Sequence, residues 1–376
     1  MQLSTRILNI ETSQTAQFTP LIARLRKEGR EIINFAVGEP HFDISMKIIG
    51  ATKQALDDRK TRYGPVAGLP ELKTRLAQDF EGYDEDNIVL SNGAKHALYS
   101  IFQAICNPGD EIIIPRPYWV SFPQQVKLAA GIPIFVDTMD HLLDCEAIEH
   151  AISPKTKAIL VNSPNNPTGA IYPKSALETI VRLACKHDLF IIADEAYDAF
   201  VYDGLESPSI FDFPEARDRA LITRSFSKRF GMTGYRVGYI AASKEIVKAI
   251  VKLQSHVTGN VCTFAQWGAL AALSIETDLV SSWKSELQRK RDIAYRLASK
   301  LFDCRKPQGA FYLFPNVSMH LKKGETSENF VTRLLENAGV AVVPGEAFGT
   351  ASHVRISYGV PEDLLVKGFE NIAEAL

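Results

Sequence analysis

Short apolar runs alternate with amphipathic segments through the middle of the chain. The segments at 96–105 and 175–188 repeat their apolar residues at helical spacing, so helices are predicted there. The predicted strands are the apolar runs at 87–91, 111–115, 131–137, 157–163, 189–195, 220–228 and 236–242. Strands that are apolar almost throughout are typical of a mostly parallel sheet with helices on both faces, so the pattern predicts an α/β fold.

The two ends of the chain have a different pattern. An arm and a predicted helix at 20–29 come first, and long charged amphipathic segments dominate from about residue 275 onward. Short strand candidates at 309–317, 340–345 and 353–359 interrupt these segments. We therefore predict a large α/β domain over residues 45–275 and a smaller α+β domain formed by residues 1–44 and 276–376.

The composition narrows the classes of function. The 376 residues carry a formal net charge of −2, and no basic block favours binding to nucleic acid or to a membrane surface. No apolar run approaches the roughly 20 residues of a membrane span, and the N-terminus lacks the apolar core of a signal peptide. The cysteines are spread out without a C-x-x-C pair, which argues against disulfides and a metal site and fits a reducing cytoplasm.

Polar clusters follow several predicted strands, where ligands bind in open α/β sheets. In "SNGAK" at 91–95, small residues would let backbone N–H groups approach a phosphate, or the segment is only a turn before a helix. Asn166, in the turn "NSPNNPTG", offers an amide, although the turn could be purely structural. Asp194 ends an apolar strand, where a carboxylate needs a partner such as a cationic ligand nitrogen, or it caps a helix.

Lys228 lies in the polar, glycine-containing stretch "SFSKRFGMTGYR". A lysine is a nucleophile only when unprotonated, and burial or the nearby charge of Arg236 would lower its pKa from the usual ~10.4. Arg236 could instead bind a phosphate, and Ser225 could add a hydrogen bond. Arg355, in "HVRISYG", presents a rigid fork suited to a carboxylate. The alternatives are a solvated lysine and a surface salt bridge.

The order and spacing of these clusters resemble one family. The pattern S-x-S-K-x-x-G-M-x-G-x-R-x-G, preceded by N-N-P-T-G and D-E-x-Y, is similar to fold-type-I, pyridoxal-phosphate-dependent aminotransferases of class I. The resemblance extends from "NFAVGEPHFD" (34–43) to "HVRISYG" (353–359), and the bacterial class-Iγ aspartate aminotransferases are the most similar branch. It implies a mostly parallel seven-stranded sheet in the large domain, a smaller α+β domain and pyridoxal phosphate as cofactor.

The resemblance also implies roles for individual residues. Lys228 matches the lysine that forms a Schiff base with the cofactor and then moves the substrate's α proton. Asp194 matches the carboxylate that pairs with the pyridinium nitrogen and keeps it protonated. Asn166 and Tyr197 match the donors to the cofactor's 3-hydroxyl oxygen. Trp119 matches the aromatic side chain that stacks on the ring and borders the substrate.

The phosphate group has its own set of matching positions. The backbone of Ala94 and Lys95, together with Ser225 and Arg236, matches the groups that hold the phosphate in the family. Tyr63 matches a tyrosine that reaches the phosphate from the neighbouring subunit. The resemblance therefore implies a homodimer with composite active sites.

The substrate contacts divide between the two ends of an amino acid. Arg355 matches the arginine that grips the α-carboxylate, helped by Gly38 and Asn166, and Lys95 matches the class-Iγ contact to a distal carboxylate. Ser13 and Thr15 in the N-terminal arm match that branch's other distal contacts. In other aspartate aminotransferases a partner-subunit arginine binds this carboxylate, but no arginine occurs between residues 251 and 267 here.

We therefore expect a cytoplasmic aminotransferase that acts on L-aspartate and 2-oxoglutarate. An aromatic or prephenate-type aminotransferase is the main alternative, since Lys95 could also serve a carboxylate on a ring. Other pyridoxal-phosphate chemistry, such as a C–S lyase or a decarboxylase, is a further alternative because the site and not the fold decides the reaction. A non-enzymatic regulatory module is the third, although no additional DNA-binding domain accompanies the chain.

Overall fold

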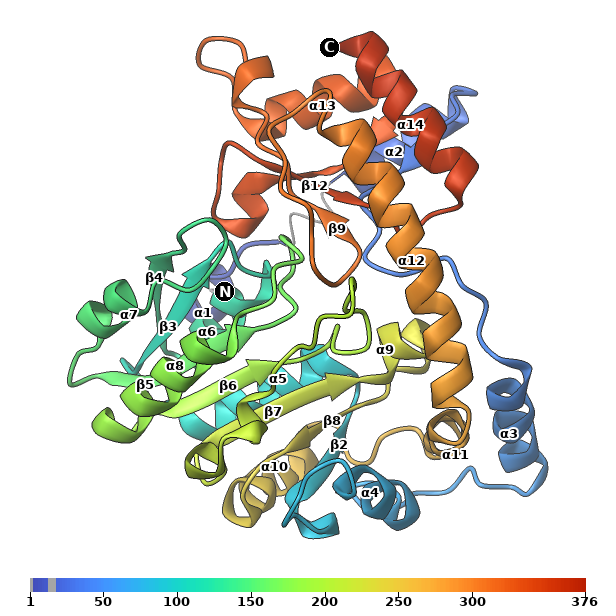
Figure 1. Ribbon diagram of the computed structural model, residues 1–376. Coiled ribbons are helices and arrows are strands. Elements are labelled where there is room, and N and C mark those ends of the chain that lie inside the picture. The colour runs from blue at the N-terminus through green and yellow to red at the C-terminus, as the bar shows by residue number, and fades with distance from the viewer. Residues whose placement is uncertain (1–2, 13–17) are drawn as a thin grey trace.

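The structure is a computed structural model that describes residues 3–12 and 18–376. Figure 1 shows a sheet with flanking helices in its lower half and a second group of helices and short strands above it. The long helix α12 (Glu276–Ala298) runs from the first group to the second (Figure 1).

The helices and strands have the following bounds. The remaining α-helices are α1 (Thr5–Leu8), α2 (Thr19–Lys27), α3 (Met46–Asp57), α4 (Pro70–Ala77), α5 (Ala94–Ile105), α6 (Ser121–Leu128), α7 (Cys145–Ala151), α8 (Lys174–His187), α9 (Phe226–Arg229), α10 (Lys244–Val257), α11 (Thr263–Leu273), α13 (Ser327–Ala338) and α14 (Glu362–Ala375). The strands are β1 (Ile33–Asn34), β2 (Ile88–Ser91), β3 (Glu111–Arg116), β4 (Ile132–Asp137), β5 (Thr156–Asn162), β6 (Phe190–Asp194), β7 (Ala220–Ser225), β8 (Gly238–Ala241), β9 (Tyr312–Leu313), β10 (Val340–Ala341), β11 (Val343–Pro344) and β12 (Val354–Ser357).

The main sheet has seven strands in the order β2-β8-β7-β6-β5-β3-β4. Strand β8 runs antiparallel to β2 and β7, and the other neighbouring strands are parallel. Adjacent residues of one strand point to opposite faces, so Ile191 belongs to one hydrophobic core and Ile192 to the other. Helices α5, α6 and α10 cover one face, and α4, α7, α8 and α11 cover the other. The predicted mostly parallel, seven-stranded α/β fold is confirmed.

The register of the parallel strands brings three strand ends together. Asn162 at the end of β5 pairs with Asp194 at the end of β6, and Asp194 pairs with Thr223 of β7. The predicted strand at 220–228 is too long. Strand β7 ends at Ser225, because the Ser225 side chain accepts a hydrogen bond from the Ser227 N–H and caps the short helix α9. Lys228 therefore lies on a helix directly after the strand.

A third hydrophobic core joins the two ends of the chain. Strand β1 pairs with β10 in parallel, and Phe35 packs with Phe369 of α14 at a ring separation of 5.9 Å. Strands β11, β12 and β9 form another small sheet, in which the strands are antiparallel. This sheet packs in the same core as α12, α13 and α14. The predicted domain boundaries at 44/45 and 275/276 stay a prediction.

Candidate active site

A cavity of about 720 Å³ lies beyond the carboxyl ends of β5, β6 and β7. Residues from the main sheet, from the segment after β1 and from β12 enclose it, so it is bounded by both ends of the chain. Among the residues that line it are the predicted site residues Gly38, Ala94, Lys95, Trp119, Asn166, Asp194, Tyr197, Ser225, Lys228, Arg236 and Arg355.

Lys228 projects into this cavity from α9. Its Nζ donates a hydrogen bond to the carbonyl oxygen of Gly38. Burial lowers the pKa of Lys228 to about 8; the Glu39 carboxylate opposes this change, and the charges of Arg355 and Arg236 add to it. At neutral pH a group with this pKa is unprotonated about one tenth of the time, so Lys228 can act as a nucleophile or as a base.

Asp194 is buried at the end of β6. Burial raises the pKa of Asp194 to about 7, the Ala196 N–H at 3.1 Å from Oδ1 lowers it, and the neighbouring Glu195 carboxylate raises it further. The contact to Ala196 closes a local turn, and no helix begins at Asp194, so the alternative of a helix cap is wrong. This contact does not offset the cost of burying the charge, so a cationic group in the cavity would stabilise the ionised form.

Several donors gather where α5 begins. Gly93 has φ of 79°, and a Cβ on it would lie 2.4 Å from Nη2 of Arg236, so only glycine lets the guanidinium lie against the loop. Arg236 is held there by hydrogen bonds to the carbonyl oxygens of Thr233 at 2.9 Å and Asn92 at 3.1 Å. The first N–H groups of α5 at Ala94, the guanidinium and the nearby Ser225 hydroxyl suit a phosphate.

A buried hydrogen-bonded group forms another wall. Asn166 Nδ2 donates to Tyr197 Oη at 3.3 Å, and Asn166 Oδ1 accepts from Arg355 Nη1 at 3.0 Å. Arg355 is 3% exposed, so the alternative of a surface salt bridge is wrong. Its Nη2 donates to the Ala36 carbonyl at 2.9 Å, and its Nε is buried without a hydrogen-bond partner among the described residues. The guanidinium lines the cavity, so its charge would suit a carboxylate there.

Two residues of this wall, Tyr312 and Asn162, were not among the predicted site residues. The Arg355 guanidinium lies over the Tyr312 ring, with its Cζ 4.4 Å from the ring centroid. The Tyr312 hydroxyl shares a hydrogen bond of 2.9 Å with the Tyr197 hydroxyl. Asn162 donates to the Asp194 carbonyl at 2.9 Å and accepts from the Asn166 N–H at 3.0 Å. The available signal was their position, in "GAFY" and at the end of a predicted strand, but only the fold brings them to the cavity.

Lys95 lines the cavity next to Trp119. Its Nζ is 5.2 Å from the centroid of the Trp119 ring, within the range of a cation–π interaction. Burial lowers the pKa of Lys95, and the charge of Arg236 adds to the effect. Lys95 also lines a neighbouring cavity of about 230 Å³ with Tyr118 and Gln125, and Gln125 donates to the Lys95 carbonyl at 2.9 Å.

Comparison with known proteins identifies the family. The chain matches the family described as aminotransferase class I and II over residues 30–372. The chain belongs to the class I and II aminotransferases. It is 38% identical over 385 residues to an aspartate aminotransferase of Geobacillus stearothermophilus, covering 99% of this chain and 98% of that protein. It is 39% identical over 388 residues to a probable aspartate/prephenate aminotransferase of Aquifex aeolicus, covering 100% and 98%.

Solved structures give the same result for the fold. The aspartate aminotransferase of Thermus thermophilus with maleate superposes with a TM-score of 0.95 at 37% identity, covering 100% of both chains. The aspartate aminotransferase of Rhizobium meliloti has a TM-score of 0.94 at 33% identity, covering 100% of this chain and 98% of that one. The predicted family, fold and enzyme class of this aminotransferase are confirmed, and membership of the family implies pyridoxal phosphate as cofactor.

Three predicted site residues are not among the described residues that line this cavity. Tyr63 of the aminotransferase is fully exposed in the loop between α3 and α4 and does not line the cavity. Ser13 and Thr15 lie outside the described residues. Their roles, like the cytoplasmic location, stay predictions.

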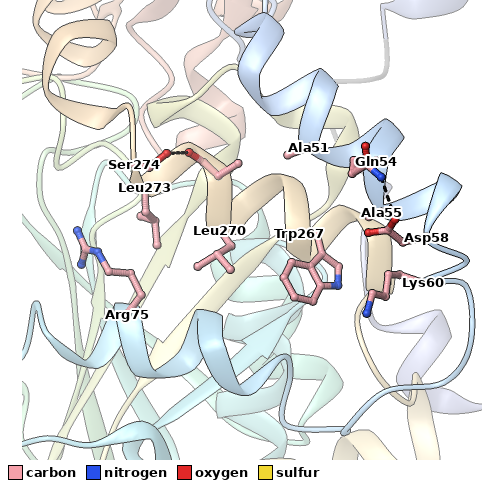
Figure 2. A pocket seen from close by; sticks show the side chains of 11 residues that line it. Ala51, Gln54, Ala55, Asp58, Lys60, Arg75, Trp267, Leu270, Leu273 and Ser274 are labelled. Carbon is pink, nitrogen blue, oxygen red and sulfur yellow. Dashed lines mark hydrogen bonds between the residues drawn. The ribbon is translucent and has the colours of Figure 1, made fainter.

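A second large pocket of the aminotransferase, of about 640 Å³, is mostly apolar (Figure 2). It lies mainly between α3, α4 and α11 and shares no lining residue with the cavity around Lys228. Within residues 3–12 and 18–376, no group of three or more metal-ligating side chains occurs, and no helix is long and apolar enough to cross a membrane. The side chains that line the second pocket are Ala51, Gln54, Ala55, Asp58, Lys60, Arg75, Trp267, Leu270, Ala271, Leu273 and Ser274.

Proposed function

We propose that this aminotransferase binds pyridoxal phosphate in the cavity around Lys228 and transfers the amino group of L-aspartate to 2-oxoglutarate. One observation carries the choice of a dicarboxylic substrate. Arg355 and Lys95 line the same cavity, and neither is paired with a carboxylate in the part of the chain that the structure describes. Two such cations favour a substrate with one carboxylate on the α-carbon and another at the end of its side chain.

The donors and acceptors of the cavity fit both ends of the cofactor. The space that a Cβ on Gly93 would fill is occupied by the guanidinium of Arg236, and this side chain would hold the phosphate together with Ser225 and the backbone of Ala94 and Lys95. Asp194 would pair with the ring nitrogen, since its buried carboxylate gains from a cationic partner.

The ring would be held by four further residues. Lys228 would bind the aldehyde carbon through Nζ, and Trp119 would stack on the ring. Asn166 and Tyr197 are hydrogen-bonded to each other and would donate to the 3-hydroxyl oxygen. Tyr312 would keep the Tyr197 hydroxyl in place through their shared hydrogen bond.

The residues of the chain then act on the substrate. When bound, pyridoxal phosphate supplies an electron sink that stabilises negative charge on the substrate's α-carbon. Lys228 has a pKa of about 8. It would take the proton from the substrate's α-carbon and deliver it to C4′, the aldehyde carbon of the cofactor. Arg355, which lines the cavity, would hold the α-carboxylate with its guanidinium, helped by Gly38 and Asn166. Lys95 would hold the distal carboxylate.

The proposal includes a homodimer with composite sites. A fully exposed aromatic side chain such as Tyr63 is typical of a surface that contacts another chain. From this loop the Tyr63 hydroxyl would contact the phosphate in the neighbouring subunit's cavity. Ser13 and Thr15 would add contacts to the distal carboxylate.

A second candidate is transfer of an amino group to prephenate, a 2-oxo acid. The Aquifex aeolicus relative and one from Thermus thermophilus are both described as aspartate/prephenate aminotransferases, and a ring carboxylate would also pair with Lys95. Purified protein should be offered a panel of amino donors with 2-oxoglutarate, and glutamate formation measured for each. Aspartate should be the best donor. A preparation that binds no pyridoxal phosphate, or that releases ammonia and pyruvate without forming glutamate, would contradict the proposal.

A further inference from the structure

A buried ion pair joins the two strands that end at the proposed cofactor site. Glu195 Oε2 accepts a hydrogen bond from Nε of Arg224 at 2.9 Å and forms an ion pair with Nη2 of the same guanidinium, also at 2.9 Å. The other carboxylate oxygen, Oε1, accepts from Ser209 Oγ at 2.6 Å. The side chains of Glu195 and Arg224 are only 7% and 16% exposed. Two contacts from one guanidinium fix its orientation as well as its distance.

Each residue of this ion pair is the sequence neighbour of a proposed cofactor-binding residue. Glu195 directly follows Asp194, the last residue of β6, and Arg224 directly precedes Ser225, the last residue of β7. The Glu195 N–H also donates to the Thr223 carbonyl at 2.9 Å. The pair therefore connects the residue that would bind the cofactor's ring nitrogen to the residue that would bind its phosphate.

Further contacts extend the connection to α9. Asp198 Oδ2 lies 3.4 Å from Arg224 Nε and 3.6 Å from Nη2 of Arg229, the residue after Lys228. The Arg224 guanidinium also lies 4.9 Å from the centroid of the Phe80 ring. A buried ion pair is weak evidence for a contribution to stability, because desolvation offsets the attraction. Its geometric effect on the strand ends is the better explanation.

We propose that Glu195 and Arg224 are positioning residues that set the separation between Asp194 and Ser225, so that one cofactor molecule binds to both. The inference rests on the proposed cofactor. Neither Glu195 nor Arg224 lines the cavity, so each acts through its neighbour in the chain. A ligand held at two ends binds tightly only when the two sites are correctly spaced, as in any bivalent interaction.

The electrostatic effects of the Glu195–Arg224 pair on its neighbours support the same proposal. The Glu195 carboxylate raises the pKa of Asp194, after burial as the main cause. Burial raises the pKa of Glu195 and Asp198 adds to this, while Arg224 is the main group that opposes the rise and keeps the carboxylate paired. Losing Arg224 would thus leave an unpaired acid next to Asp194 as well as removing the connection between the strands.

The test compares two ligands that differ only in the phosphate. Dissociation constants for pyridoxal phosphate and for pyridoxal are measured by absorbance titration with the wild-type protein, Arg224→Met and the double variant Glu195→Gln/Arg224→Met. The double variant leaves no buried charge of this pair, so it covers the case in which Arg224→Met does not fold. Arg291→Met is the matched control, because Arg291 is fully buried, pairs with Asp203 at 2.7 and 2.8 Å and lies outside the cavity.

We expect the preference for pyridoxal phosphate over pyridoxal to fall at least about fivefold in the Arg224 variants, because spacing matters only for the ligand held at both ends. The Arg291→Met preference should match that of the wild type. A smaller fall in the folded Arg224 variants, or an equal fall in Arg291→Met, would overturn the positioning role. If the wild-type protein does not bind pyridoxal phosphate, the proposed function itself fails, so the two failures are distinguishable.

Discussion

Arg355 donates a hydrogen bond from Nη1 to Oδ1 of Asn166 at 3.0 Å, although 189 positions separate them in the sequence. The contact ties β12 to the turn after β5. Because the guanidinium also binds the Ala36 carbonyl and lies over the Tyr312 ring, its orientation is fixed from three sides. A carboxylate that enters the cavity would meet an arginine already in place, which reduces the entropy lost on binding.

Replacing Arg355 by lysine should therefore weaken catalysis, although the positive charge is retained. A lysine cannot form the same planar set of contacts, and losing a charge-assisted hydrogen bond of about 1.5–3 kcal/mol should lower kcat/KM for aspartate about 10- to 100-fold. Steady-state kinetics measure the change. The control is Arg333→Lys: like Arg355, Arg333 donates to a backbone carbonyl, that of His320, but its other partner is the Glu325 carboxylate and it lies outside the cavity. Similar losses in both variants would contradict a specific role for Arg355.

Lys228 should react with the cofactor at an unusually low pH. Its pKa is lowered to about 8, so the reactive neutral amine becomes available as the pH rises through that value. The rate of the absorbance change on adding pyridoxal phosphate to cofactor-free protein should rise with a midpoint near pH 8, measured by stopped flow. Nα-acetyl-lysine is the control, and its rate should rise with a midpoint near the ordinary pKa of the lysine ε-amine, about 10.4. A protein midpoint equal to that of the control would refute the lowered pKa.

Asp194 should destabilise the cofactor-free protein at alkaline pH. Because its pKa is raised from 3.8 to about 7, the folded state binds a proton more tightly than the unfolded state does. The resulting stability is present below about pH 4 and is lost as the pH rises through 7, up to about 4 kcal/mol. Asp194→Asn should thus unfold at higher urea concentration than the wild type at pH 8, and at nearly the same concentration at pH 4.

A matched aspartate separates this effect from a general one. Asp144 accepts the Ala147 N–H at 2.9 Å, much as Asp194 accepts the Ala196 N–H at 3.1 Å, but it lies outside the cavity. Asp144→Asn should not be more stable to urea than the wild type at either pH. If Asp194→Asn is not more stable either, the burial of an ionised carboxylate at the end of β6 would not carry the cost inferred here.

Lys95 should decide between donors with one and two carboxylates. Lys95→Ala should lower kcat/KM for aspartate at least about tenfold, the effect of one charge-assisted contact, and change it for alanine less than about threefold. Transfer to 2-oxoglutarate is followed for both donors. Lys95→Arg keeps the charge and should retain more of the aspartate activity. Equal losses for aspartate and alanine would show that Lys95 supports the site without selecting the substrate.

The sequence predicted the parts of the site that lie at strand ends. Asp194 and Asn166 follow apolar runs, and the parallel sheet brings such ends together. The exact end of β7 was missed, because no glycine or proline in "SFSK" marks the end of the strand and only the cap made by the Ser225 side chain shows where it stops. Tyr312 and the Glu195–Arg224 pair depend on contacts between distant segments, which no local pattern reveals.

Tyr63 should act in the neighbouring subunit. Lys228→Ala and Tyr63→Ala would each be inactive or strongly impaired alone, but a mixed dimer of the two would contain one cavity with both residues intact. If the subunits re-associate at random after mild denaturation, half of the dimers are mixed and each has one complete site, so about a quarter of wild-type activity should return. Each variant refolded alone is the control. If mixing restores nothing, Tyr63 serves its own chain or has no role in the site.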